Sequence, residues 1–308
     1  MLIALVLTSL DATAGTGPWT LPEGDLSVYA GAEYQRIGKL AVSGGSWDPE
    51  AVVDVDEGIE KAGAQLIVGY GVRDRIDVQL QVPYLYVTAN RTDGALCTTV
   101  GQRGCDTTDG LGVIGVRVKG LVIDELIGAP VSVAIGGDLR IGQHTSDTRA
   151  RITNLGEGTT DLGGFASVGR SGALGEGYWS SYLEVGGVYR FPNTDASGAP
   201  VPGSEMHADL EWLGGARPAW AIGPAITMLW RPEGVDFEQL DAADPDRFAA
   251  LNVLNVRAGG KLIVRSSKRT SLALAVFGTA FAKNNPADQV IVTAGLSGQL
   301  ATRGARER

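Results

Sequence analysis

The stretch VGYGVRDRIDVQLQVPY, residues 68–84, alternates apolar and polar residues on both sides of a short charged turn. Val68, Tyr70 and Val72 are separated by glycines, and the residues after Ile76 alternate with Asp and Gln. This period-two alternation predicts strands with one face in an apolar medium and the other in a polar one. Because the pattern recurs to the end of the chain, it restricts the fold to an all-β architecture.

The alternation predicts about twelve strands, most of them long enough to cross a bilayer when tilted. They lie near residues 24–36, 60–72, 75–88, 110–122, 130–142, 159–170, 177–191, 204–215, 218–231, 250–265, 270–283 and 288–301. No convincing amphipathic helix is present, although the segment 235–250 could hold a short one.

The connections between these strands alternate long and short. The long ones are 37–59, 89–109, 143–158, 192–203 and 232–249, and the short ones lie at 73–74, 124–129, 171–176, 216–217 and 266–269. The connection at 284–287 is the exception: the alternation calls for a long loop there, but this one is short. Tight periplasmic turns and long external loops are typical of outer-membrane barrels. A water-soluble barrel or sandwich would show the same alternation within its strands, but it has no reason to sort its loops.

Composition supports this class. The chain has 308 residues, 44 of them glycine, and a formal charge of -9, which argues against nucleic-acid binding. No apolar run reaches the roughly 18 residues that a membrane-spanning helix needs. We therefore predict a closed antiparallel transmembrane β-barrel of about twelve strands, with short periplasmic turns and long extracellular loops.

The amino terminus suggests export. Residues 2–10 are almost continuously apolar, and Ala12-Thr13-Ala14 fits a secretory cleavage pattern, although a positive leading region is missing. We expect a signal peptide at 1–14, one barrel domain at 15–301 and a polar tail at 302–308. Cys97 and Cys105 lie in a Gly/Thr-rich segment and predict a disulfide-closed loop, with metal ligation as the weaker alternative.

The polar faces of the strands define candidate lumen-lining residues. These are Glu33, Lys61, Asp77, Arg117, Lys119, Asp138, Arg140, Asp161, Glu184, Arg190, His207, Asp209, Glu211, Arg257 and Lys261. Their charges nearly balance, so they either pair across a narrow lumen, which we favour, or line a wet pore with a transverse field. Aromatic residues near strand ends predict interfacial girdles: Trp19, Tyr84, Tyr86, Trp179, Trp212, Trp220 and Trp230.

Other motifs give weaker indications. GLGVIG at 110–115 satisfies a dinucleotide pattern, but a strand follows it instead of a helix. A lipid hydrolase would need His144 or His207 on the outer, lipid-facing side of the wall. His207, however, falls on the alternating positions that are predicted to face the lumen. Neither the first nor the fifth long connection has the full set of ligands of an EF-hand calcium loop, although both are rich in acidic residues. These residues are Asp54, Asp56, Glu57, Asp236, Glu238, Asp241, Asp244 and Asp246. We expect no catalytic residues, cofactor or metal.

Three segments resemble one known family. Gly69-Tyr70-Gly71-Val72-Arg73-Asp74-Arg75, running into Val82-Pro83-Tyr84, is similar to a hairpin of the outer-membrane family called "MetA-pathway of phenol degradation". Asp109-Gly110-Leu111-Gly112 and the segment 154–164 resemble two further motifs, although Val113 stands where the family often has Asp. The resemblance implies a transporter or channel of Gram-negative bacteria, with hydrophobic or aromatic compounds as substrates. The last strand departs from it because it runs into Leu300 and ATRGARER without a terminal aromatic residue.

The expected function is passive passage of small solutes across the bacterial outer membrane by a monomer or weak oligomer. Expected partners are outer-membrane lipid and lipopolysaccharide, the barrel assembly machinery and a small-molecule solute, with no nucleic acid. The alternatives are a non-conducting barrel whose acidic loops bind a surface partner or cations and, less favoured, a lipid hydrolase.

Overall fold

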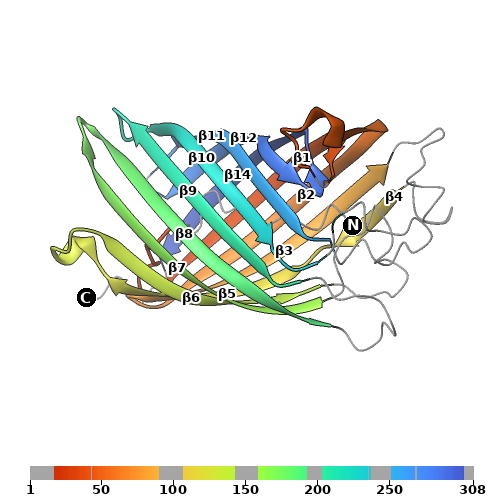
Figure 1. Cartoon of the computed structure of the whole chain (residues 1–308). Helices are drawn as coiled ribbons and strands as arrows, with labels where there is room; N and C mark the ends of the chain where they lie inside the picture. Colours follow the sequence, from red (N-terminus) through yellow and green to blue (C-terminus); the bar gives the residue numbers. More distant parts are fainter. Residues whose placement is uncertain are drawn as a thin grey trace.

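The computed structural model is a closed barrel of twelve antiparallel strands. It describes residues 17–42, 44–89, 107–142, 159–192, 203–234, 236, 251–267 and 269–301. Neighbouring strands hydrogen-bond in chain order, and β1 (Asp25–Ala41) pairs with both β2 (Val52–Arg73) and β14 (Gln289–Ala301) (Figure 1). This double pairing closes the sheet and removes its free edges.

The remaining strands complete the wall. They are β3 (Ile76–Ala89), β4 (Thr107–Leu111), β5 (Ile114–Ile123), β6 (Ser132–Ile141), β7 (Thr159–Leu174), β8 (Gly177–Pro192), β9 (Glu205–Gly215), β10 (Trp220–Arg231), β11 (Val253–Arg265), β12 (Thr270–Lys283) and β13 (Asn285–Pro286). Both β4 and β5 pair with β3 and act as one barrel strand, whereas β13 is a short bridge to β1. Within the described ranges, no helix has the length and apolar character needed to cross a membrane.

The first connection differs from the prediction. Residues 37–59 were expected to form a long loop, but β1 continues to Ala41, β2 begins at Val52, and the turn between them contains the 3-10 helix η2 (Pro49–Ala51). The two strands stay paired beyond a register shift between Ile37 and Lys39, where Gly58 has a φ of 77°. Asp54, Asp56 and Glu57 therefore lie on a strand. The segment 235–250, where a short helix was considered, lies outside the described residues except for Asp236.

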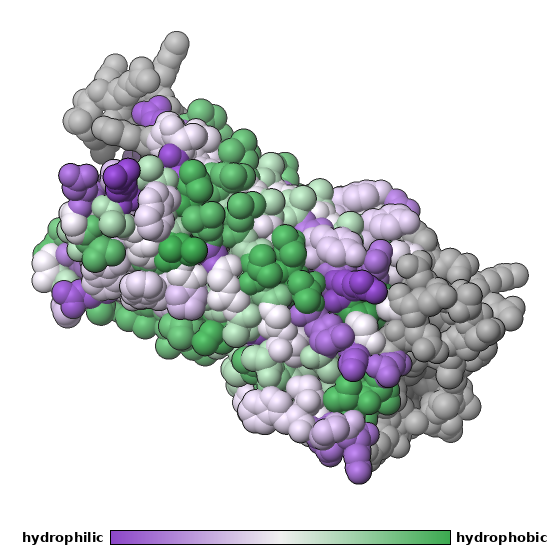
Figure 2. All heavy atoms as spheres, turned by 90° about the horizontal axis from the view of Figure 1, so that it is seen from above, coloured by the Kyte–Doolittle hydropathy of each residue, from purple (hydrophilic) through white to green (hydrophobic). Residues whose placement is uncertain are grey.

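The two faces of the wall differ as the alternation predicts. On β9, Met206, Leu210 and Trp212 are 46–49% exposed on the outside, whereas Glu205, His207 and Glu211 are 4–7% exposed on the inside. Figure 2 shows apolar residues over the middle of the wall and hydrophilic residues mostly toward its ends. An apolar outer band and a polar interior are the arrangement of barrels that sit in lipid.

The short connections gather at one end of the barrel, at the left of Figure 1. They include the Asp74–Arg75 turn, the turn with the 3-10 helix η3 (Glu125–Ile127), and the turns at 175–176, 216–219 and 266–269. This end is here called the short-turn end.

Candidate functional site: the barrel lumen

The structure places all fifteen predicted lumen residues on the inner face of the wall. Twelve of them are buried, and Arg117, Arg140 and Asp209 are half-buried. Positive and negative members meet between strands. Lys61 on β2 lies 4.0 Å from Glu33 on the neighbouring β1, and Lys261 on β11 reaches past β10 to Glu211 on β9 at 2.5 Å. The charges inside the barrel are thus largely paired with each other.

Among the described residues, one group of charges surrounds Glu205 on β9. Its carboxylate accepts hydrogen bonds from Arg190 and from Arg231, the latter at 2.9 Å, and Arg140 lies 3.7 Å away. Arg190 also pairs with Asp161 at 3.7 Å. Neither Glu205 nor Arg231 was predicted as a lumen residue. The sequence did contain a signal for Glu205, which falls on the same alternating positions as His207, Asp209 and Glu211. The strand register then brings Glu205 beside Arg231, because Met206 lies opposite Trp230.

Inward-facing glycines hold ring side chains against the wall. A Cβ atom on Gly186 would lie 2.5 Å from the imidazole of His207, and one on Gly31 would lie 2.3 Å from the Tyr29 hydroxyl. Both rings therefore lie over a neighbouring glycine instead of projecting across the lumen. His207 faces the interior, on the opposite side of the wall from where a lipid hydrolase would need it.

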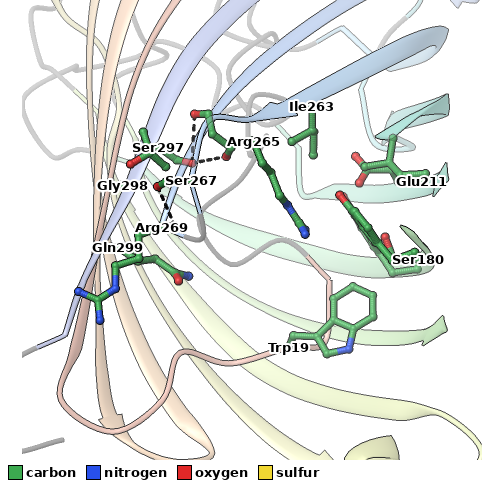
Figure 3. A pocket seen from close by; sticks show the side chains of 16 residues that line it. Trp19, Ser180, Glu211, Ile263, Arg265, Ser267, Arg269, Ser297, Gly298 and Gln299 are labelled. Carbon is green, nitrogen blue, oxygen red and sulfur yellow. Dashed lines mark hydrogen bonds between the residues drawn. The ribbon is translucent and has the colours of Figure 1, made fainter. Parts of the chain in front are cut away.

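The short-turn end of the lumen contains a cavity beside Trp19 (Figure 3). Trp19 was predicted to belong to an interfacial girdle, and this prediction is wrong. Its ring packs edge-on against the ring of Tyr182, with the ring centroids 6.5 Å apart. Tyr182 falls on the same alternating positions of β8 as Glu184 and therefore faces the lumen. Trp19 precedes the first strand, so its position depends on how the chain enters the barrel. The other predicted girdle residues lie on the wall, and Tyr84, Tyr86, Trp212, Trp220 and Trp230 are 38–48% exposed.

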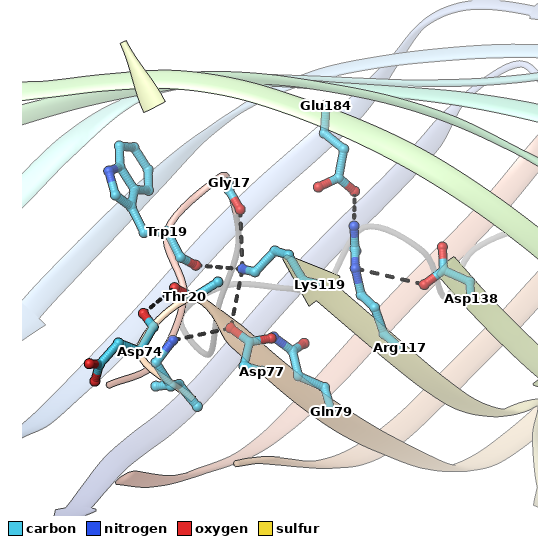
Figure 4. Close-up of polar contacts among 11 residues, drawn as sticks. Gly17, Trp19, Thr20, Asp74, Asp77, Gln79, Arg117, Lys119, Asp138 and Glu184 are labelled. Carbon is cyan, nitrogen blue, oxygen red and sulfur yellow. Dashed lines mark hydrogen bonds and ion pairs between the residues drawn. The ribbon is translucent and has the colours of Figure 1, made fainter. Parts of the chain in front are cut away.

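The segment Gly17–Gly24, here called the N-terminal segment, lies across this end of the lumen. Lys119 Nζ donates to the carbonyl oxygens of Gly17 at 3.2 Å and Trp19 at 2.5 Å, and it lies 3.7 Å from Asp77 (Figure 4). Asp77 in turn accepts from the Leu21 amide at 3.1 Å. Lys119 and Asp77 are both fully buried, so this ion pair fixes the segment to the wall.

The other side of the N-terminal segment is bound to the turns. Trp19 Nε1 donates to Glu125 at 3.1 Å, and Glu125 also accepts from the backbone and hydroxyl of Ser171. Burial raises the pKa of Glu125, but these hydrogen bonds outweigh it and hold the pKa below its usual value. The segment therefore connects β3, β5 and the η3 turn across the mouth.

Arg117 occupies the lumen beyond this segment. Its guanidinium lies 3.6 Å from the centre of the Phe165 ring, donates to Glu184 and approaches Asp138 to 3.7 Å (Figure 4). Phe165 itself lies over Gly136. The stacking and the two carboxylates hold Arg117 in one orientation, which a surface arginine would not keep.

Several predicted features lie outside the described residues. These are His144, Cys97 and Cys105, the residues of the expected signal peptide and the polar tail. Among the described residues, no group of three or more His, Cys, Asp or Glu could hold a metal ion. Asp236 is bound instead by Lys283 at 2.9 Å and by Asn252 and Asn284. After GLGVIG the structure continues as the strand β5, not as a helix.

The closed wall, apolar outside and charged inside, is the fold of outer-membrane barrels. In particular, the chain is similar to the COG4313 outer membrane channel from Pseudomonas putida F1, at 14% identity and a TM-score of 0.68 over 94% of this chain and 100% of that one. It is also similar to the NanC porin, at 8% identity and a TM-score of 0.50 over 89% and 100%. These likenesses show that the chain shares the fold of outer-membrane barrels. No family model and no curated protein matches the chain.

Proposed function

We propose that this chain is a passive outer-membrane channel for small solutes. The observation that carries the proposal is the continuous charged and polar inner face of a closed wall whose outer face is apolar. Polar inward side chains can replace part of a solute's hydration shell during passage. Hydrophobic or aromatic compounds are the finer substrate proposal, and they rest on the family resemblance.

Single-channel recording in a planar bilayer tests the channel directly. We expect discrete current steps from the purified full chain. Uptake of sugars, amino acids and aromatic acids into protein-loaded vesicles would then rank the solutes. A silent bilayer together with vesicles that take up none of them would reject passive transport.

One observation favours a second candidate, a non-conducting barrel. The N-terminal segment crosses the short-turn end and is held by the buried Lys119–Asp77 pair. In this candidate the barrel serves as a scaffold, and its acidic extracellular connections bind a surface partner or cations. If the wild-type chain and a Lys119→Met variant are both silent, the scaffold is favoured. Current in either one favours the channel.

A further inference from the structure

A cavity of about 360 Å³ lies at the short-turn end of the lumen, between Trp19 and the ends of six strands. Its size is within the range of small-molecule binding pockets. Three kinds of side chain line it: one arginine that reaches inward, a group of hydroxyls, and aromatic rings. Each kind restricts the chemistry of a ligand in a different way.

Arg265, the last residue of β11, supplies the positive charge. Figure 3 shows its side chain extending into the cavity toward Glu211 and Ser180, and its guanidinium lies 4.1 Å from the centre of the Tyr178 ring. Within the described part of the chain, no carboxylate forms an ion pair with Arg265. Stacking on a ring orients the planar guanidinium, whose paired N–H groups match a carboxylate.

Glu211 also lines the cavity, but its charge is balanced locally. Lys261 Nζ lies 2.5 Å from the Glu211 carboxylate and donates a hydrogen bond to it. An anion near Arg265 would therefore not face an uncompensated negative charge.

Hydroxyl groups form the opposite wall. Ser27 is 3% exposed, and its Oγ atom has no hydrogen-bond partner among the described residues. The hydroxyls of Ser271 and Ser297 lie 2.7 Å apart (Figure 3). Each serine can donate and accept, so this wall fits the hydroxyl groups of a solute. The Ser27 Oγ atom is covered by protein and lies against Gly69, so the hydroxyls available to a solute are those of the half-buried Ser271 and Ser297.

Aromatic rings complete the cavity. Trp19 and Tyr182 meet edge-on, and Tyr178 carries the guanidinium of Arg265. Aromatic side chains combine a large apolar face with a polar tip, and such faces suit the C–H surface of a ring-shaped solute. A ligand that uses all three kinds of side chain has a carboxylate, several hydroxyls and a ring.

We propose that this cavity binds a small cyclic hydroxy acid of the uronate class. Arg265 binds the carboxylate, Ser271 and Ser297 bind the hydroxyls, and Trp19 covers the ring. The proposal rests on the proposed channel function, and it names a different solute class from the hydrophobic or aromatic compounds that the family resemblance implies. Because Trp19 belongs to the N-terminal segment, the binding site is complete only while that segment is in place.

Isothermal titration calorimetry of the detergent-solubilised full chain tests this site. We expect glucuronate to bind, and both glucose, which lacks the carboxylate, and benzoate, which lacks the hydroxyls, to bind at least about tenfold more weakly. Arg265→Gln should weaken glucuronate binding at least about tenfold, and Ser271→Ala should weaken it less. Arg217→Gln, an exposed arginine in a turn at the same end, is the matched control and should bind as the wild type does.

Three results would overturn the site: no glucuronate binding to the wild type, equal binding by Arg265→Gln, or equal binding of benzoate. The gel shift between unheated and boiled samples verifies that each variant is folded, and Arg265→Lys replaces the Gln variant if that one does not fold. Bilayer currents separate this inference from the channel itself. Current without glucuronate binding rejects only the site, whereas binding without current rejects only the channel.

Discussion

At the scale of single residues, the interior depends on charges that are buried but paired. Glu205 illustrates this because three arginines from β6, β8 and β10 approach one carboxylate. Taking such groups out of water is costly, and the cost is offset only while partners remain. Removal of one member should therefore affect stability far more than loss of an exposed pair.

Glu205→Gln should lower the free energy of unfolding by about 3–5 kcal/mol, because Arg231 is fully buried and loses a carboxylate 2.9 Å away. Urea unfolding in detergent or lipid measures the change. The matched control is Asp54→Asn, which breaks the exposed Lys39–Asp54 pair and should cost no more than about 1 kcal/mol. Equal losses from the two variants would contradict the role given to the cluster.

Gly186→Ala should force the His207 ring away from the wall and into the lumen, because the new Cβ would lie 2.5 Å from it. Such overpacking typically costs about 1–3 kcal/mol. We expect a less stable barrel and a lower single-channel conductance. At Gly298 an added Cβ meets nothing within 4 Å, so Gly298→Ala should change neither quantity.

At the scale of elements, the N-terminal segment is the part that most affects the path through the barrel. It has no strand pairing along most of its length and is held by side chains, chiefly Lys119, Asp77 and Glu125. Elements held by few contacts open more easily than the strands of a closed sheet. Loosening these contacts should therefore widen the path and leave the wall intact.

Glu125 gives the segment a pH dependence. Its pKa in the folded chain lies below the ordinary value of 4.5, so its contribution is present at neutral pH and is lost as the pH falls through that depressed pKa. We expect conductance to rise on acidification below pH 4.5, because a neutral Glu125 accepts weaker hydrogen bonds from Trp19 and Ser171 than the carboxylate does. Glu125→Gln should start at a higher conductance and lack most of this step. A variant with the same acid step as the wild type would show that another group is responsible.

At the scale of the whole molecule, the apolar exterior requires lipid or detergent around the middle of the wall. Leu210 is 47% exposed near the centre of β9, opposite Leu183 and Ile226 on the neighbouring strands. Leu300 is 59% exposed but lies at the end of β14. Both residues are exposed leucines, and they differ in their distance from the middle of the wall.

Leu210→Arg should destabilise the barrel by about 2–4 kcal/mol, and Leu300→Arg by only about 0–1 kcal/mol, because the cost of a charge falls toward the membrane interface. Reversible unfolding in lipid vesicles measures both values. Equal small costs, together with a chain that stays monodisperse without detergent, would show that water covers this face.

Much of the wall could be predicted from the sequence. The alternation along β9 placed Leu210 outside and Glu211 inside, and the strand bounds agree within a few residues in most cases. The exception at 37–59 arose because β1 and β2 continue past a register shift, which period-two reasoning does not detect. The inner-face positions of all fifteen lumen candidates followed from parity alone.

The sequence by itself determined which side of each strand faces an apolar medium, because side-chain direction along a strand alternates with every residue. Only the tertiary structure decided which inward groups meet. The Glu205 group depends on the register of several strands, and the positions of Trp19 and the Arg265 cavity depend on where the N-terminal segment crosses the mouth. These contacts join residues far apart in the chain, and no local pattern encodes the closure that brings them together.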